Sequence, residues 1–181
     1  METADEAMVL ARVRAGDTAA YAELVTRHAP VARRLAVLSG AGSDADDVVQ
    51  EAFVKAYRSL SSFRDGAEFR PWLLRIVINE SRNLHRGQSR RSERELRVVR
   101  EDVHLVTGSD PADAAVREER REALLGAIRT LPGELREVVT CRYLLELSET
   151  ETAEALGIPN GTVKSRLRRG LARLREALAD V

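Results

Sequence analysis

The fold of this chain is decided by the stretch Leu147-Ser-Glu-Thr-Glu-Thr-Ala-Glu-Ala-Leu-Gly-Ile-Pro-Asn-Gly-Thr-Val-Lys-Ser-Arg-Leu167. A serine followed three residues later by a glutamate has the spacing of a capping box, so a short helix is predicted to begin at Ser148. Gly157 is suited to the left-handed conformation that ends such a helix. Ile158 is expected to fill the corner before a new helix opens near Asn160. The stretch therefore predicts a helix-turn-helix.

The second helix of this stretch separates apolar from basic residues. Spacings of three and four residues place its large aliphatic residues on one buried stripe, formed by Val163, Leu167, Leu171, Leu174 and Leu178. Between residues 160 and 175 there are six basic residues and no acidic one. The residues that point away from the stripe or flank it are Gly161, Thr162, Lys164, Ser165, Arg166, Arg168 and Arg169. Such a face suits the major groove of DNA; the alternative is a solvated basic face on an ordinary helical hairpin.

The composition around this stretch is typical of a helical protein. Of the 181 residues 44% are hydrophobic and only 4% are aromatic. Ala, Leu, Arg and Glu dominate, all of which favour helix, and no sustained alternation of apolar and polar residues occurs. We therefore predict an all-α fold rather than a β-sandwich or barrel. The 29 basic residues balance 29 acidic ones, which excludes a protein that is basic overall but not a locally basic surface.

Several classes of chemistry are excluded by what the sequence lacks. The single cysteine, Cys141, rules out an intramolecular disulfide or a cysteine-based zinc site, and its apolar surroundings predict a buried thiol. The three histidines, His28, His85 and His104, lie in separate segments without the spacing of metal ligands. No phosphate-binding glycine loop or nucleophilic triad stands out, so we expect no cofactor and no enzyme. With no run of 18 apolar residues and an acidic N-terminus, we expect no membrane insertion and a cytoplasmic location.

Helical periodicity falls into two blocks, which predicts two domains. Residues 1–86 and 113–181 are periodic, whereas residues 87–112 are polar and contain the breaker Gly108-Ser-Asp-Pro111. A segment of this length is typical of a linker between domains. The helices expected in the first block are Asp5–Ala15, Thr18–Leu38 (capped by Asp17), one from Ser43 or Asp44 to Leu60, and Trp72–Arg86. Those expected in the second block are Asp113–Thr130, Pro132–Leu145, Ser148–Leu156 and Asn160–Ala179.

The helix that begins near Asp44 has a buried and an exposed face. Its buried stripe is expected to consist of Val48, Val49, Ala52, Phe53, Ala56 and Leu60. Its opposite face holds Asp47, Gln50, Glu51, Val54 and Arg58. Val54 is an apolar residue left on the exposed side, but exposed charges are common, so these residues by themselves indicate an ordinary amphipathic surface.

A polar loop precedes the helix that starts near Pro71, a residue suited to a first helical turn. The buried stripe of this helix is predicted to include Trp72, Leu73, Ile76, Val77 and Leu84. The outer face is predicted to present Arg75, Ile78, Arg82, His85 and Arg86, with Asn79 and Ser81 at its flanks. Glu80 falls on the buried stripe, so we expect an arginine partner or a capping role for its carboxylate.

Taken in order, these segments resemble a bacterial sigma factor of the sigma-70 family, in its short extracytoplasmic-function (ECF) form. The resemblance rests on residues 44–58, on Phe63-Arg-Asp-Gly-Ala-Glu-Phe-Arg-Pro-Trp-Leu-Leu-Arg-Ile76, on Leu131-Pro-Gly-Glu-Leu-Arg-Glu-Val-Val139, and on residues 157–167. It implies a promoter-specificity subunit that binds core RNA polymerase and directs DNA melting and transcription initiation. Residues 1–86 resemble region 2, residues 87–112 region 3.2, and residues 113–181 region 4.

The resemblance also implies roles for individual residues. The face made of Asp47, Gln50, Glu51, Val54 and Arg58 would dock on the β′ coiled coil of the polymerase, and the region 4-like domain on its β flap. The minus-ten element would be read by a loop that traps a flipped base and by the helix after it, through Phe63, Arg64, Phe69, Arg75, Asn79, Arg82, His85 and Arg86. The minus-thirty-five element would contact Gly161, Thr162, Lys164, Ser165, Arg166, Arg168 and Arg169. An anti-sigma factor is an expected partner.

Two other interpretations of the same residues stay open at this point. One is a stand-alone helix-turn-helix regulator whose first domain senses a signal or dimerises. The other is an all-helical interaction adaptor. For Phe63 and Phe69, packing under the loop is the alternative to contact with a flipped base.

Overall fold

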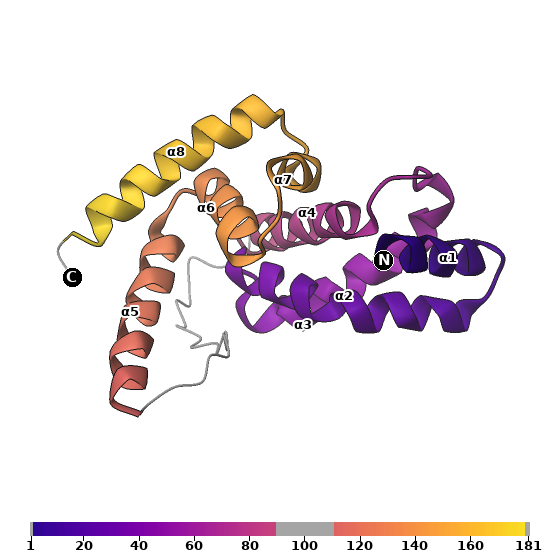
Figure 1. Ribbon diagram of the computed structural model, residues 1–181, viewed down its shortest axis with the longest axis horizontal. Coiled ribbons are helices and arrows are strands. Elements are labelled where there is room, and N and C mark those ends of the chain that lie inside the picture. Colours follow the sequence, from indigo (N-terminus) through magenta and orange to yellow (C-terminus); the bar gives the residue numbers. More distant parts are fainter. Residues whose placement is uncertain (1, 90–110, 180–181) are drawn as a thin grey trace. The chain divides into compact units, whose positions relative to one another are not determined.

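The computed structural model describes residues 2–89 and 111–179, and within them every regular element is a helix (Figure 1). This confirms the all-α prediction. Contacts divide the chain into two compact units, with helices α1 to α4 in the first and α5, α6 and α8 in the second. Up to residue 89 the helices are α1 (Glu2–Arg14), α2 (Thr18–Leu38), α3 (Ala45–Ser59) and α4 (Phe69–Ser89), with 3-10 turns at Gly42–Asp44 and Leu60–Ser62. After residue 110 they are α5 (Pro111–Thr130), α6 (Gly133–Val139), α7 (Glu149–Leu156) and α8 (Asn160–Ala177).

Helix α2 is the centre of the first unit, because it packs against α1, α3 and α4. Its start is fixed by Asp17, whose carboxylate accepts a hydrogen bond of 3.1 Å from the Ala20 amide, as predicted for an N-cap. On α3 the predicted stripe is buried in full, comprising Val48, Val49, Ala52, Phe53 and Ala56, with Leu60 following. The apolar pattern of the sequence therefore predicted this interface correctly.

Helix α4 differs from its prediction in extent and in burial. It begins at Phe69, three residues earlier than expected, and Pro71 lies in its first turn. Ile78, which was predicted to face outward, is 1% exposed. That prediction was wrong because α4 packs against both α2 and α3, so its buried face is wider than one stripe.

The buried carboxylate on α4 has the cationic partner that its position required. Lys55 Nζ lies 2.6 Å from Glu80 Oε2, and the Glu80 side chain is only 13% exposed. The hydrogen bond to Glu80 raises the pKa of Lys55, so the ammonium group stays charged. The partner is a lysine of α3 rather than the expected arginine.

In the second unit, α5, α6 and α8 pack around one apolar cluster. Its buried members are Ala127, Ile128, Leu131, Leu135, Val139 and Leu174, against which Leu144, Leu167, Leu171 and Leu178 pack. The leucine stripe predicted on α8 is thus the side that faces the core. The backbones of α6 and α8 approach closely at Gly170, where an added Cβ would lie 2.8 Å from Val139 Cγ2.

The helix expected over residues 132–145 is not uniform. Helix α6 ends at Val139 and continues as a π-helix over Thr140–Leu144. Glu146 follows with a φ of 56°, a left-handed conformation that is uncommon for a residue other than glycine. Cys141 lies within the π-helix and is fully buried, which confirms the prediction of a core thiol. A π-helical turn is not visible in the apolar pattern, because it shifts register by a single residue.

Of the linker predicted over residues 87–112, residues 90–110 lie outside the part of the chain that the structure describes. The side chain of His85 also lies outside it.

Candidate nucleic-acid interface

The helix-turn-helix has the local geometry that its sequence predicts. The Ser148 amide donates to Glu151 Oε2 at 2.6 Å, and the Glu151 amide donates to Ser148 Oγ at 3.2 Å, so the capping box is reciprocal. Gly157 has a φ of +65°, the left-handed conformation expected for the turn. Helix α8 then opens at Asn160, after Pro159. Helix α7, the turn and helix α8 therefore follow one another along the chain as predicted.

The polar face of α8 is open to solvent along most of its length. Gly161, Lys164, Ser165, Arg168 and Arg169 are exposed, whereas Thr162 and Arg166 are half-buried. Nothing lies within 4 Å of a Cβ built on Gly161, so another backbone has room to approach there. The helix thus carries a line of donors and cations on the side opposite its leucine stripe, which is the arrangement that a major-groove helix needs.

Two carboxylates of the same unit lie against these cations. Glu134 Oε2 is 2.7 Å from Arg166 Nη2, and Glu134 Oε1 is 3.9 Å from Arg169 Nη2. Glu149 Oε2 is 3.4 Å from Lys164 Nζ. Arg166 is paired with Glu134 and its side chain is only 21% exposed. The Lys164 side chain is 65% exposed and therefore stays accessible. The basic face is therefore partly neutralised within the folded chain.

In the first unit, the aromatic residues of the loop before α4 are packed beneath it. Phe63 is 5% and Phe69 0% exposed. The Phe63 ring lies 4.9 Å from the Trp72 ring and 5.9 Å from the Phe69 ring, measured between centroids. Both rings therefore pack beneath the loop, which is the alternative interpretation of these residues. Arg64, at the turn above them, is exposed.

The exposed side of α4 carries a stripe of polar residues. Arg75, Asn79 and Arg86 are exposed and Arg82 is half-buried, at helical spacings of four, three and four residues. Residues at these spacings share one helix face. The face therefore presents three guanidinium groups and one amide, which are donors suited to phosphates and base edges.

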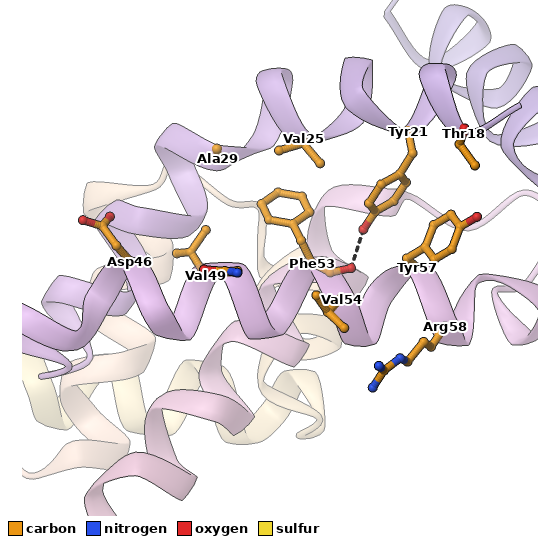
Figure 2. Close-up of a pocket in the computed structure, with 11 residues that line it drawn as sticks. Thr18, Tyr21, Val25, Ala29, Asp46, Val49, Phe53, Val54, Tyr57 and Arg58 are labelled. Carbon is orange, nitrogen blue, oxygen red and sulfur yellow. Dashed lines mark hydrogen bonds between the residues drawn. The ribbon is translucent and has the colours of Figure 1, made fainter.

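An apolar groove runs along the surface between α2 and α3 in the first unit (Figure 2). It has a volume of about 700 Å³. Val25 and Ala29 line it from α2, while Val49, Phe53 and Val54 line it from α3. Polar residues at the edges of the groove are Thr18, Asp46, Gln50 and Arg58. Of the residues predicted on the exposed face of α3, Gln50, Val54 and Arg58 line this groove, whereas Asp47 and Glu51 are exposed but do not line it.

Tyr21 and Tyr57 lie at one end of the groove, with ring centroids 4.9 Å apart. The Tyr21 hydroxyl donates to the Phe53 carbonyl at 2.6 Å. Burial raises the pKa of Tyr21 to about 12, so the hydroxyl stays protonated and able to donate at neutral pH. This bond ties the two walls of the groove together.

Two family models match the chain over most of the described residues. Sigma-70 region 2 matches residues 24–91, and sigma-70 region 4 matches residues 121–174. The ECF RNA polymerase sigma-E factor of Escherichia coli strain K12 is 36% identical over 183 aligned positions, which cover 98% of this chain and 94% of that protein. The chain belongs to the ECF sigma factors of the sigma-70 family. It is therefore a non-enzymatic sigma factor that directs transcription initiation.

Other relatives agree with this assignment. The ECF sigma-E factor of Haemophilus influenzae is 36% identical over 90% of this sigma factor and 89% of its own length. The structure of CnrH in complex with the cytosolic domain of CnrY aligns with a TM-score of 0.69 at 31% identity and covers 96% of both chains. The fold is shared with the sigma factor RpoE from Bartonella quintana, solved with the anti-sigma factor NepR, at a TM-score of 0.67 and 24% identity over 88% of this chain and 96% of that one.

The wall of the groove that α2 forms, and the carboxylates of Glu134 and Glu149 beside the basic face, were not predicted from the sequence. Tyr21, Val25 and Ala29 recur every four residues along α2, so their shared face was visible in the sequence. The contacts of Glu134 with α8 carried no sequence signal, because they join helices far apart in the chain.

Within residues 2–89 and 111–179, no cluster of three or more histidine, cysteine or acidic residues is placed to hold a metal ion. In the same residues, no helix has both the length and the apolar character required to cross a membrane.

Proposed function

We propose that this sigma factor docks on core RNA polymerase through the groove between α2 and α3 and the adjoining exposed face of α3. The occupant would be the β′ coiled coil, received as an amphipathic helix. The observation that carries the proposal is the combination of an apolar floor with polar edges in the groove. An amphipathic helix matches it, because its apolar face can cover the floor while its polar flanks meet the edges. Asp47 and Glu51, outside the groove, would then meet polar groups at the edge of the contact.

The two DNA-reading surfaces are proposed to lie on α4 with its preceding loop, and on α8. For the minus-ten element we retain Arg64, Arg75, Asn79, Arg82 and Arg86, of which Arg82 is half-buried and the others are exposed. Phe63 and Phe69 would shape the loop from beneath, rather than stack on a base. His85 remains a proposal from the sequence alone. For the minus-thirty-five element, the exposed residues of α8 would contact bases and phosphates.

Arg166 would differ from its neighbours on α8. Its pairing with Glu134 favours a positioning role or a phosphate contact over base reading, because a covered guanidinium cannot reach far into a groove.

Further parts of the proposal concern regulation and organisation. An anti-sigma protein would hold the factor inactive, as the relatives crystallised with CnrY and NepR suggest. Region 4 would also contact the β flap. Residues 87–112 would connect domains 1–86 and 113–181 as a region 3.2-like linker, and the factor would act in the cytoplasm, where the polymerase is found.

The docking proposal is tested by placing a charge in the groove. Val54→Glu puts a carboxylate among the apolar lining residues, and we expect the affinity of the full chain for core polymerase to fall at least tenfold. Met8→Glu is the matched control, since Met8 is an apolar residue of α1 that is 63% exposed and does not line the groove. Binding is measured by fluorescence titration of labelled full-length chain with core enzyme. Equal affinities of Val54→Glu and the unmodified factor would contradict the proposal.

A further inference from the structure

One guanidinium joins the first helix to the loop that precedes α4. Arg14 stands at the last position of α1, and the loop spans residues 60–68. Arg14 Nη2 donates to the Phe63 carbonyl, and Arg14 Nε donates to the Leu60 carbonyl at 3.4 Å. Arg14 Nη1 bonds the carboxylate of Asp65. Three acceptors on one short loop are therefore gathered by a single side chain.

The same guanidinium also covers an aromatic ring of the loop. Its central carbon lies 5.8 Å from the centroid of Phe63, within the range of a cation–π contact. The Arg14 side chain is 31% exposed, so the carbonyl bonds are partly shielded from water. Asp65 is 90% exposed, so its carboxylate adds less than the two carbonyls do. The planar fork of arginine holds its donors at fixed angles, so it can serve several acceptors in one defined geometry.

The side of the loop that faces α1 also borders a cavity. A cavity of about 360 Å³ separates α1 from the loop and is lined by Leu10, Arg14, Phe63 and Gly66, among others. From below, the loop rests on the buried rings of Phe63 and Phe69. Its tip turns at Gly66, with a φ of +77°, and residues 64–68 are exposed. The base of the loop is therefore fixed by a ring cluster and by Arg14, while its tip projects into solvent.

We propose that Arg14 is a positioning residue for minus-ten recognition: it holds the loop in the shape that captures a nucleotide. This rests on the proposed function of the loop. Arg14 itself would touch no DNA. Without Arg14, the loop samples other shapes. Part of the binding free energy of the correct nucleotide is then used to order the loop, so the preference for that nucleotide falls. The effect expected is thus a loss of discrimination, confined to the nucleotide that the loop captures.

The matched control is Arg12, which lies on the same helix. Arg12 pairs with Asp17 at 2.8 Å and with Glu23 at 2.9 Å, at the junction of α1 with α2. These partners lie outside the loop. Arg12→Ala and Arg14→Ala therefore both remove a paired arginine from α1, but only the second releases the loop.

The experiment measures open-complex formation by holoenzyme assembled from full-length factor and core polymerase. The templates are a promoter found by mapping transcription starts, and variants of it that each change one nucleotide of the minus-ten or the minus-thirty-five element. Permanganate reactivity of unpaired thymines gives the rate on each template. When the captured nucleotide is changed, we expect Arg14→Ala to lower the ratio of the rate on the native template to the rate on the changed template at least threefold. We expect the corresponding rate ratios for minus-thirty-five changes to stay within twofold of those of the unmodified factor. Arg12→Ala is expected to keep every ratio.

A second measurement observes the loop directly in the full-length factor. Hydrogen exchange of the Phe63 and Ala67 amides, which donate to the Leu60 and Arg64 carbonyls, should become at least tenfold faster in Arg14→Ala, while amides of α3 keep their protection. An unchanged ratio, an equal slowing on all templates, or unchanged exchange in the loop would each overturn the role of Arg14. Absence of any minus-ten discrimination by the unmodified holoenzyme would instead overturn the proposed role of the loop, and with it the proposal that depends on it.

Discussion

Gly170 is the place where a single methyl group should disturb region 4. It is buried on α8, and an alanine Cβ there would lie 2.8 Å from Val139 Cγ2 and 3.6 Å from the Leu135 carbonyl oxygen. Val139 is 2% exposed and β-branched, so its methyl group cannot rotate away without moving its neighbours. Gly170→Ala must therefore push α8 away from α6 or force strain into both.

Two opposing terms set the size of the effect. Overpacking of a core by one methyl group costs about 1–3 kcal/mol. Replacing glycine by alanine inside a helix returns about 0.5–1 kcal/mol through backbone entropy and helix propensity. Taking the middle of each range, roughly 2 kcal/mol against roughly 0.75 kcal/mol, we expect the free energy of opening of the α6–α8 unit to fall by about 1–2 kcal/mol. Gly126→Ala is the matched control, since nothing lies within 4 Å of its Cβ, and there only the favourable term should act.

The assay is native-state hydrogen exchange, read separately on the amides of α6 and α8, because a chain with two units need not unfold in a single step. A loss of about 1–2 kcal/mol corresponds to exchange that is roughly 5–30 times faster. The double variant Val139→Ala with Gly170→Ala removes the clashing methyl group, so the two changes should cost less together than the sum of the single changes, by about 1 kcal/mol. Unchanged or slower exchange in Gly170→Ala, or strict additivity of the pair, would refute the close approach on which this reasoning depends.

Three further predictions concern DNA binding, backbone strain and pH. If Arg168 reads a base, Arg168→Ala should weaken binding of the holoenzyme to a promoter by about 1–3 kcal/mol; if it contacts a phosphate, the slope of log affinity against log salt concentration should fall by about one. Filter binding across a salt series separates these two roles. No change in either quantity would remove Arg168 from the interface. Glu146→Gly should stabilise region 4 by about 0.5–1 kcal/mol, because glycine adopts the φ of 56° without strain, and slower hydrogen exchange in α6 would report it. Hydrogen bonds from Arg12 and from the Ala20 amide lower the pKa of Asp17, so its charge stabilises the folded state above the ordinary carboxylate pKa of about 3.9 and this contribution is lost as the pH falls below it. The stability difference between the unmodified factor and Asp17→Asn should therefore shrink on acidification below about pH 4, and a difference that grows there would contradict the assignment.

Features that depend on residues close in sequence were predictable. The capping box of Ser148 with Glu151, the left-handed Gly157 and the N-cap Asp17 each concern residues within a few positions of one another. Stripes at helical spacing likewise predicted the buried faces of α3 and α8. In these cases, local backbone chemistry and burial favour the same structure.

Features that depend on packing between distant segments were not predictable. Ile78 is buried because two helices contact α4, and no pattern within α4 reveals the second contact. The burial of Phe63 and Phe69 depends on how the loop folds over Trp72. Glu80 clearly needed a cation, but the choice of Lys55 follows from the placement of α3. The predicted site residues therefore lie on the expected elements, while their exposure had to come from the structure.

As an ECF sigma factor, this chain directs where core RNA polymerase initiates transcription. The most direct measurement compares transcription of genomic DNA by core polymerase with and without the purified full-length chain, mapping the 5′ end of every transcript. New, discrete starts are expected to appear only with the chain, each preceded by the same two short sequence elements at a constant separation. Identical start maps with and without the chain would contradict it.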